Sequence, residues 1–199
     1  MDMFCRQCEQ AVRGKACELK KGVCGKTVEV AALQDLLVHS LKGIAVYGNL
    51  AHTVDTRDEE TEYFIVGGLF ATVTNVNFDP QQLKKIILRS YEIKNKIKKV
   101  FSDSYRKRNR KDFDGELPDI VAWEPADTLE GLIEQGSNVG IMADPNVNED
   151  MRSLREILLY GLKGMAAYAD HALILGKQDS EVSLFFYKGL SALTNNDLS

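Results

Sequence analysis

The sequence lacks several features, and each absence excludes a class of protein. No apolar stretch precedes the first cysteine, so we expect no secretory signal. No apolar run approaches the ~20 residues that a membrane-spanning helix needs. The formal net charge of −4 argues against a general binder of nucleic acids or of anionic membranes. We therefore expect a cytoplasmic protein with neither a nucleic-acid nor a membrane partner.

Cysteine is absent from the whole chain after Cys24, so all four cysteines fall in one short segment. Cys5, Cys8, Cys17 and Cys24 have the pattern Cys-x2-Cys-x8-Cys-x6-Cys. In a reducing compartment disulfides are rare, and clustered cysteines are typically metal ligands or redox groups. Thiolates bind zinc and iron–sulfur clusters alike. The spacing therefore predicts a metal centre without deciding which metal it holds.

The rest of the chain has apolar residues at helical spacing. Residues 27–54 are predicted to form a first helix, with Thr27 as its cap. The pattern Thr56-x-x-Glu59 predicts a capping box at the start of a second helix. Asp79-Pro80 predicts the start of a third. Three helices with short connections predict an antiparallel bundle.

A strongly basic segment is followed by an acidic one. Residues 84–111 contain twelve Lys or Arg and two acidic residues, whereas residues 112–150 contain eleven Asp or Glu and no Lys or Arg. Proline and glycine predict an irregular connection in the acidic part, with room for a short helix near residues 128–135. The basic run 106–111 could dock an acidic redox donor protein, but a solvated helix end is the favoured interpretation.

The C-terminal part of the chain repeats the first bundle. Residues 154–168 align without a gap with residues 33–47, which implies duplicated supersecondary units. We interpret the equivalent pairs Lys42-Gly43 and Lys163-Gly164 as packing positions rather than as catalytic lysines. The second copy stops before a third helix, so we expect a fragment or a chain that pairs with a partner.

The expected fold is all-α, with two repeated three-helix-bundle units of which the second lacks its third helix. The predicted boundaries are a cysteine-rich loop at 1–26, a first bundle at 27–111, an acidic irregular linker at 112–147 and a second, truncated bundle at 148–199.

Five stretches carry a family resemblance: Met3-Phe4-Cys5-Arg6-Gln7-Cys8-Glu9-Gln10, Gly22-Val23-Cys24-Gly25-Lys26, Leu33-Gln34-Asp35-Leu36-Leu37, Thr74-Asn75-Val76-Asn77-Phe78 and Leu158-Leu159-Tyr160-Gly161-Leu162-Lys163-Gly164. Together they resemble the hybrid cluster proteins, also called hydroxylamine reductases. The resemblance runs along essentially all of this chain but covers only the N-terminal, helical third or so of that family. It implies two three-helix bundles and a cluster held by Cys5, Cys8, Cys17 and Cys24.

The resemblance implies a [4Fe–4S] cluster, with one departure. The cubane form of the family usually has five residues between the last two cysteines, whereas six separate Cys17 from Cys24 here. Some members with a longer loop carry a [2Fe–2S] cluster instead. The gap of eight residues between Cys8 and Cys17 matches the cubane form. We therefore expect [4Fe–4S], with [2Fe–2S] as the alternative and zinc less favoured.

The catalytic centre of that family is a hybrid iron–sulfur–oxygen cluster, bound by His, Glu and Cys of later α/β domains. This sequence has no cysteine after Cys24. His39, His52 and His171 lie on predicted helices, and we interpret them as ordinary helix histidines. We therefore assign no catalytic residue to this chain and expect a hybrid cluster only if the remaining α/β domains exist.

The function implied by the resemblance is electron transfer within a hydroxylamine reductase. Such an enzyme reduces hydroxylamine to ammonia, or reduces nitric oxide, with electrons from a redox donor protein. The alternative is a stand-alone helical binding module, stabilised by zinc or by a cluster and without catalysis. Bound iron and acid-labile sulfide would distinguish the iron–sulfur protein from the zinc form of this module.

Overall fold

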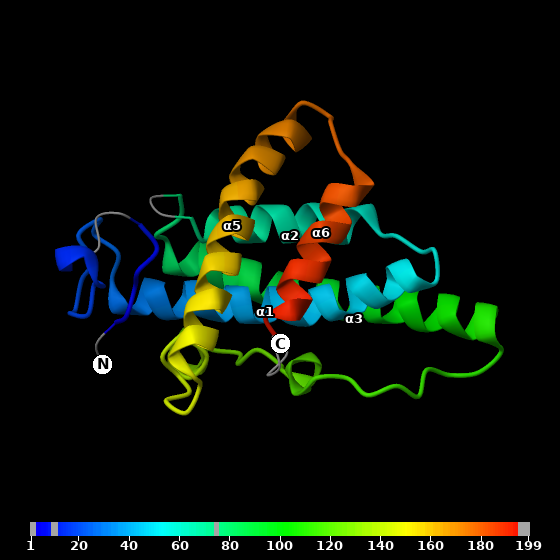
Figure 1. Ribbon diagram of the computed structural model, residues 1–199, viewed down its shortest axis with the longest axis horizontal. Coiled ribbons are helices and arrows are strands. Elements are labelled where there is room, and N and C mark those ends of the chain that lie inside the picture. The colour runs from blue at the N-terminus through cyan, green and yellow to red at the C-terminus, as the bar shows by residue number, and fades with distance from the viewer. Residues whose placement is uncertain (1–2, 9–11, 74–75, 195–199) are drawn as a thin grey trace.

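The computed structural model describes residues 3–8, 12–73 and 76–194, and it confirms the expected all-α class (Figure 1). Within these residues, two isolated bridges are the sole strand-like pairings. The helices, in chain order, are η1 (Val12–Gly14), α1 (Val28–Thr53), α2 (Glu59–Ala71), α3 (Pro80–Asn109), η2 (Asp119–Ala122), α4 (Leu129–Ser137), α5 (Glu149–Ile174) and α6 (Ser180–Ala192), with η denoting 3-10 helices.

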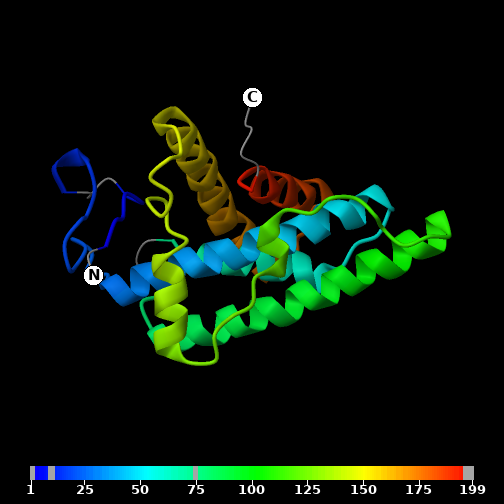
Figure 2. The same ribbon diagram turned by 90° about the horizontal axis from the view of Figure 1, so that it is seen from below.

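Helix α1 lies at the centre of the molecule (Figure 2). Leu33, Leu37 and Leu41 are fully buried, because α3, α4 and α6 pack around this helix and α2 returns beside it. The predicted cap is confirmed, since the Thr27 hydroxyl oxygen accepts the Val30 N–H at 3.4 Å. Helix α1 therefore supplies most of the surface on which the other helices are placed.

Helices α2 and α3 complete an up-down-up arrangement, since α2 reverses direction and α3 runs in the same sense as α1 (Figures 1 and 2). Asp79 caps α3 and Pro80 is its first residue, as predicted. The capping box predicted at Thr56 is wrong. The cap of α2 is Asp58, whose carboxylate accepts the Thr61 N–H at 2.9 Å. Asp is a better cap than Thr, so the helix begins at the later position.

The connection after α3 runs back along the bundle (Figure 1). It contains α4, close to the short helix expected near residues 128–135, and η2, which was not expected. Lys94 is 4% exposed, and its ammonium donates hydrogen bonds to the carbonyls of Val121, at 2.9 Å, and of Trp123. A Cβ on Gly43 would lie 3.3 Å from the Ile120 carbonyl oxygen. The connection is thus fastened to both α3 and α1.

The basic end of α3 is paired with nearby carboxylates, in keeping with a solvated helix end balanced by acidic neighbours. Exposed ion pairs of this kind contribute about 0–1 kcal/mol each. They are Arg106–Asp112 at 2.6 Å, Arg108–Asp55 at 2.6 Å and Lys111–Asp114 at 3.0 Å.

The sequence repeat corresponds to a repeated helical hairpin. An offset of 121 residues carries the bounds of α1 onto those of α5 and the bounds of α2 onto those of α6. The packing is also repeated: a Cβ on Gly68 would lie 2.9 Å from Leu41, and a Cβ on Gly189 would lie 2.8 Å from Leu162. The hairpins cross, with α1 against α6 and α2 against α5. The predicted domain boundaries and the assignment to two three-helix units stay predictions.

The close approach of α4 to α1 gives a test of the packing. A Cβ on Gly136 would lie 2.1 Å from the Ala32 carbonyl oxygen, whereas a Cβ on Gly161 of α5 would meet nothing within 4 Å. Gly136→Ala should therefore lower the free energy of unfolding by about 1–3 kcal/mol. Gly161→Ala should raise it by up to about 1 kcal/mol, because alanine favours helix. Urea denaturation followed by circular dichroism measures both, and equal effects would contradict the contact.

Candidate metal centre

Two of the four cysteines lie side by side. Cys5 and Cys17 form an isolated antiparallel bridge, in which each backbone N–H donates to the other carbonyl at 3.0 and 2.8 Å. Side chains of a directly opposed pair point to the same face, with Cα atoms about 5.5 Å apart. The Met3 N–H extends the pairing to the Leu19 carbonyl at 3.3 Å. The chain reversal between Cys8 and Cys17 therefore brings the first and third cysteines together.

Cys24 lies in a tight turn that leads into α1. The Gly22 N–H donates to the Lys26 carbonyl at 2.8 Å, and the Gly25 N–H donates to the Gly22 carbonyl at 2.9 Å. Gly25 has φ of +91°, a conformation that glycine adopts without a steric penalty. A Cβ on Gly22 would lie 3.4 Å from the Cys24 sulfur. The turn therefore leaves the Cys24 sulfur close to the backbone.

None of the four cysteines is in a disulfide, and Cys8 and Cys24 are half-buried. Among the described residues, no three His, Cys, Asp or Glu side chains are close enough together to hold a metal ion. The structure thus brings Cys5 and Cys17 together but does not bring Cys8 and Cys24 into one ligand group with them. In donor type and number, four thiols in one short segment fit a thiolate-bound metal group.

A buried lysine lies beside the cysteine pair. Lys26 is 1% exposed, and its ammonium lies 3.9 Å from the Cys5 sulfur and 5.8 Å from the centre of the Phe78 ring. Burial raises the pKa of the Cys5 thiol, and the charge of Lys26 opposes that rise. Lys26 thus supplies positive charge where a thiolate would need it.

The cysteine segment is attached to α5. The Arg6 guanidinium pairs with the Glu156 carboxylate at 2.7 Å, and the Lys163 ammonium donates to the Gln7 side-chain oxygen at 3.0 Å. Lys163 is 6% exposed. Arg6 and Gln7, the two residues between Cys5 and Cys8, therefore both have partners on the second hairpin.

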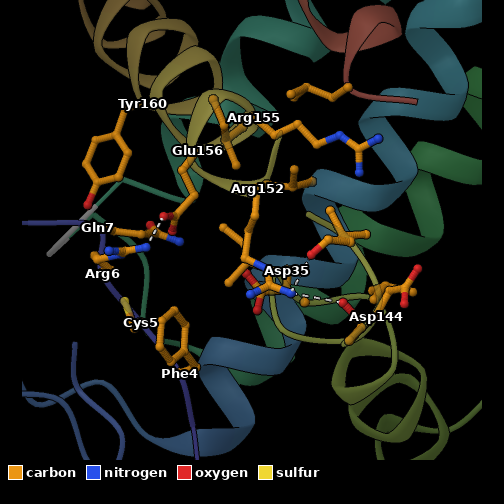
Figure 3. A pocket seen from close by; sticks show the side chains of 18 of the residues that line it. Phe4, Cys5, Arg6, Gln7, Asp35, Asp144, Arg152, Arg155, Glu156 and Tyr160 are labelled. Atoms are coloured by element: carbon orange, nitrogen blue, oxygen red, sulfur yellow. Dashed lines mark hydrogen bonds and ion pairs between the residues drawn. The ribbon is translucent and has the colours of Figure 1, made fainter. Parts of the chain in front are cut away.

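Next to Cys5 is a cavity of about 260 Å³, lined by the cysteine segment, α1, α5 and the α4–α5 connection (Figure 3). Asp35, Lys42 and Lys163 line it. Burial raises the pKa of Asp35 to about 6, against the opposing charge of Lys163. Burial lowers the pKa of Lys42 and of Lys163 to about 8. The cavity is therefore lined by buried groups that carry charge.

The repeat predicts that Lys42-Gly43 and Lys163-Gly164 are packing positions. Gly43 is in close contact, whereas a Cβ on Gly164 would meet nothing within 4 Å. The two lysines instead meet at the same cavity, although they are one repeat apart in sequence. A sequence pattern could have identified Lys42 and Lys163 as site residues, because the two repeats both have a lysine at this position of an otherwise apolar helix stretch.

The three histidines lie on helices, as predicted, and each ring is near an aromatic ring. Burial lowers the pKa of His39 to about 4. The ring-centre distances are 5.7 Å for His39–Trp123, 5.9 Å for His52–Tyr187 and 5.9 Å for His171–Phe70.

The raised pKa of Asp35 predicts a pH dependence of stability. The Asp35 carboxyl binds its proton more tightly in the folded protein than in the unfolded chain, where its pKa has the ordinary value of 3.8. The free energy of unfolding therefore falls as the pH rises from about 4 to about 6. Asp35→Asn should remove this loss, and the stability of the variant relative to the wild type should increase over that range. Urea unfolding at several pH values measures the difference, with the exposed Asp127→Asn as control. A constant difference would contradict the raised pKa.

None of the described helices is long and apolar enough to cross a membrane.

Comparison with known proteins identifies the family. Residues 3–199 match the Prismane/CO dehydrogenase family. Relatives named hydroxylamine reductase include those of Geobacter sulfurreducens, 50% identical over 196 residues, and Geobacter metallireducens, 48% identical over 192 residues, each match covering 96% of this chain. That of Halothermothrix orenii is 46% identical over 199 residues and covers 100% of this chain.

These matches cover 34%, 35% and 35% of the respective relatives, so the chain spans about a third of their length. Because the family match extends over nearly every residue, this chain belongs to the Prismane/CO dehydrogenase family.

Proposed function

We propose that this chain is the N-terminal, electron-transferring part of a hydroxylamine reductase. Cys5, Cys8, Cys17 and Cys24 would hold an iron–sulfur cluster, and a hybrid cluster in further α/β domains would reduce hydroxylamine to ammonia, or reduce nitric oxide. The observation that carries the proposal is the pairing of Cys5 with Cys17 in a segment that contains every thiol of the chain. Membership of a family whose proteins bind iron–sulfur clusters supports it.

The cluster that we propose is [4Fe–4S], which would supply one-electron transfer. The residues around it have separate roles. Lys26 places a buried positive charge beside Cys5, which favours the thiolate over the thiol. The pairs that Arg6 and Gln7 form with α5 hold the Cys-x-x-Cys segment in place. Met3 and Ala31 pack with Cys17 and exclude water from that side.

We also propose that a third helix, from further domains or from a partner chain, covers the exposed face of α5. Ile157, Gly161, Gly164 and Tyr168 recur at helical spacing and share this face. Ile157 is 68% and Tyr168 is 82% exposed.

The equivalent positions in the first copy are covered. Leu36, which corresponds to Ile157, is fully buried, and Tyr47, which corresponds to Tyr168, is 3% exposed. Tyr47 packs against Phe101 of α3, with ring centres 6.5 Å apart. A helix placed like α3 would therefore bury the same face of the second copy.

The cluster is tested by reconstituting the chain anaerobically with iron and sulfide. We expect equal amounts of iron and acid-labile sulfide, about four of each per chain, and visible absorption that bleaches on reduction. Replacing each cysteine in turn by serine should lower iron content at least ~10-fold, because loss of even an outer-shell partner costs 10–100-fold in metal affinity. Lys20→Gln, an exposed change between Cys17 and Cys24, is the control.

Other results would change the proposal in defined ways. About two iron and two sulfide per chain would indicate [2Fe–2S], and zinc without sulfide would favour a stand-alone binding module. Turnover of hydroxylamine by this chain alone would contradict the location of the catalytic centre in further domains.

The proposed third helix predicts a context-dependent effect of Ile157→Lys. In the 199-residue chain the side chain is exposed, so the free energy of unfolding should change by no more than about 0.5 kcal/mol. In a longer protein or a complex that supplies the helix, it should fall by about 2–5 kcal/mol. Leu36→Lys is the matched comparison and should be destabilising in both. A small effect of Ile157→Lys in both settings would contradict the proposal.

A further inference from the structure

The cavity beside Cys5 has more positive than negative side chains. Its three carboxylates are Asp35, Asp144 and Glu156. Its five cationic side chains are Arg6, Lys42, Arg152, Arg155 and Lys163. Even with Asp35 ionised, the wall has a surplus of two positive charges. Confined charge of one sign raises the local concentration of counter-ions.

Two of these cations, Lys42 and Arg152, form no ion pair with a carboxylate in the part of the chain that the structure describes. Glu156 is already paired with Arg6 at 2.7 Å, and Lys163 donates to Gln7. Lys42, in contrast, forms neither an ion pair nor a hydrogen bond with any described residue.

Arg152 is bound to oxygen atoms that carry no charge. Its Nη2 donates to the backbone carbonyls of Asp144, at 3.1 Å, and Val147, at 3.4 Å. Its Nε is buried and has no hydrogen-bond partner. A buried donor without a partner costs about 1–3 kcal/mol, and a ligand that accepts from it would recover part of that cost.

The proposed cluster does not account for the charge of Lys42. Burial lowers the pKa of Lys163 and of Lys42, the Asp35 carboxylate opposes that effect on each, and Cys5 acts on Lys163 and not on Lys42. The positive charge of Arg155 acts on Lys42 more strongly than Asp35 does, and an added anion stabilises a cation in such surroundings. Lys42 and Arg152 therefore both line the cavity without forming an ion pair with a carboxylate of the described residues.

We propose that this cavity binds a small oxygen anion, an oxoanion or a carboxylate, with Lys42 of α1 and Arg152 of α5 as its principal contacts. The cavity volume of about 260 Å³ lies below the roughly 300–1,000 Å³ of sites for drug-sized ligands, which favours a small ligand. The Nε–H of Arg152, which has no other partner, can donate to one oxygen of such an anion. Arg152 extends from α5 toward Asp144 across the cavity (Figure 3).

Isothermal titration of the full chain tests the proposal. The titrants are inorganic phosphate and nitrite as oxoanions, and acetate and malonate as carboxylates, at low ionic strength because salt screens such contacts. At least one titrant should bind saturably, with one site per chain. The order of their affinities shows whether the cavity prefers an oxoanion or a carboxylate. Titration with and without the reconstituted cluster separates this result from the fate of the proposed function.

Charge-removing variants locate the site. Lys42→Gln and Arg152→Gln should each weaken binding at least about tenfold, the loss expected for one charge-assisted contact. Lys188→Gln removes the same charge from an exposed position of α6 and should change the affinity by less than about twofold. Lys42→Arg keeps the charge and should retain binding within about fivefold.

Thermal unfolding establishes that each variant is folded before titration. If Lys42→Gln does not fold, the affinities of Arg152→Gln and Lys42→Arg can still be compared with that of Lys188→Gln. Saturable binding that is lost in the cavity variants alone supports the proposal. Absence of saturation with all four titrants, or an equal loss in Lys188→Gln, overturns it and leaves the charges with a structural role.

Discussion

Mutual burial of two helical hairpins is the constraint on which the rest of the structure depends. Neither hairpin covers its own apolar surface, so α1 packs against α6 and α2 against α5. Each fully buried leucine contributes about 1.5–3 kcal/mol, and close packing at Gly68 and Gly189 lets Leu41 and Leu162 take equivalent places. The crossing also places α5 beside the cysteine segment, to which it is joined through Arg6 and Gln7.

The charged site follows from that crossing. Lys42 and Lys163 would be remote in an extended chain, but the crossing hairpins direct both to one cavity. Burying ammonium groups is unfavourable unless something compensates them. For Lys163 the compensation comes from the Asp35 carboxylate and from the side-chain oxygen of Gln7. Asp35 also acts on Lys42, but Lys42 has no ion pair or hydrogen bond with a described residue, so the two lysines of one cavity are compensated to different extents.

The sequence was sufficient for features that depend on local chemistry. The caps Thr27 and Asp79 predicted where α1 and α3 begin, and the repeat predicted a second hairpin. Features that depend on distant contacts could not be predicted. The pairing of Cys5 with Cys17 requires a chain reversal, and the cavity requires residues one repeat apart. The error in predicting the cap of α2 had a local cause. Thr56 and Asp58 are both residues that cap helices, and the Thr-x-x-Glu spacing alone does not show which of the two is used.

The attachment of the cysteine segment to α5 has a consequence for the order in which the molecule assembles. The partners of Arg6 and Gln7 are 150 and 156 positions further along the chain. Contacts so distant in sequence form slowly, because a long loop must close before they contribute. During synthesis the thiols emerge first, yet the residues that hold them in place emerge much later. Maturation of this segment therefore belongs to the end of folding, after the helices have set its surroundings.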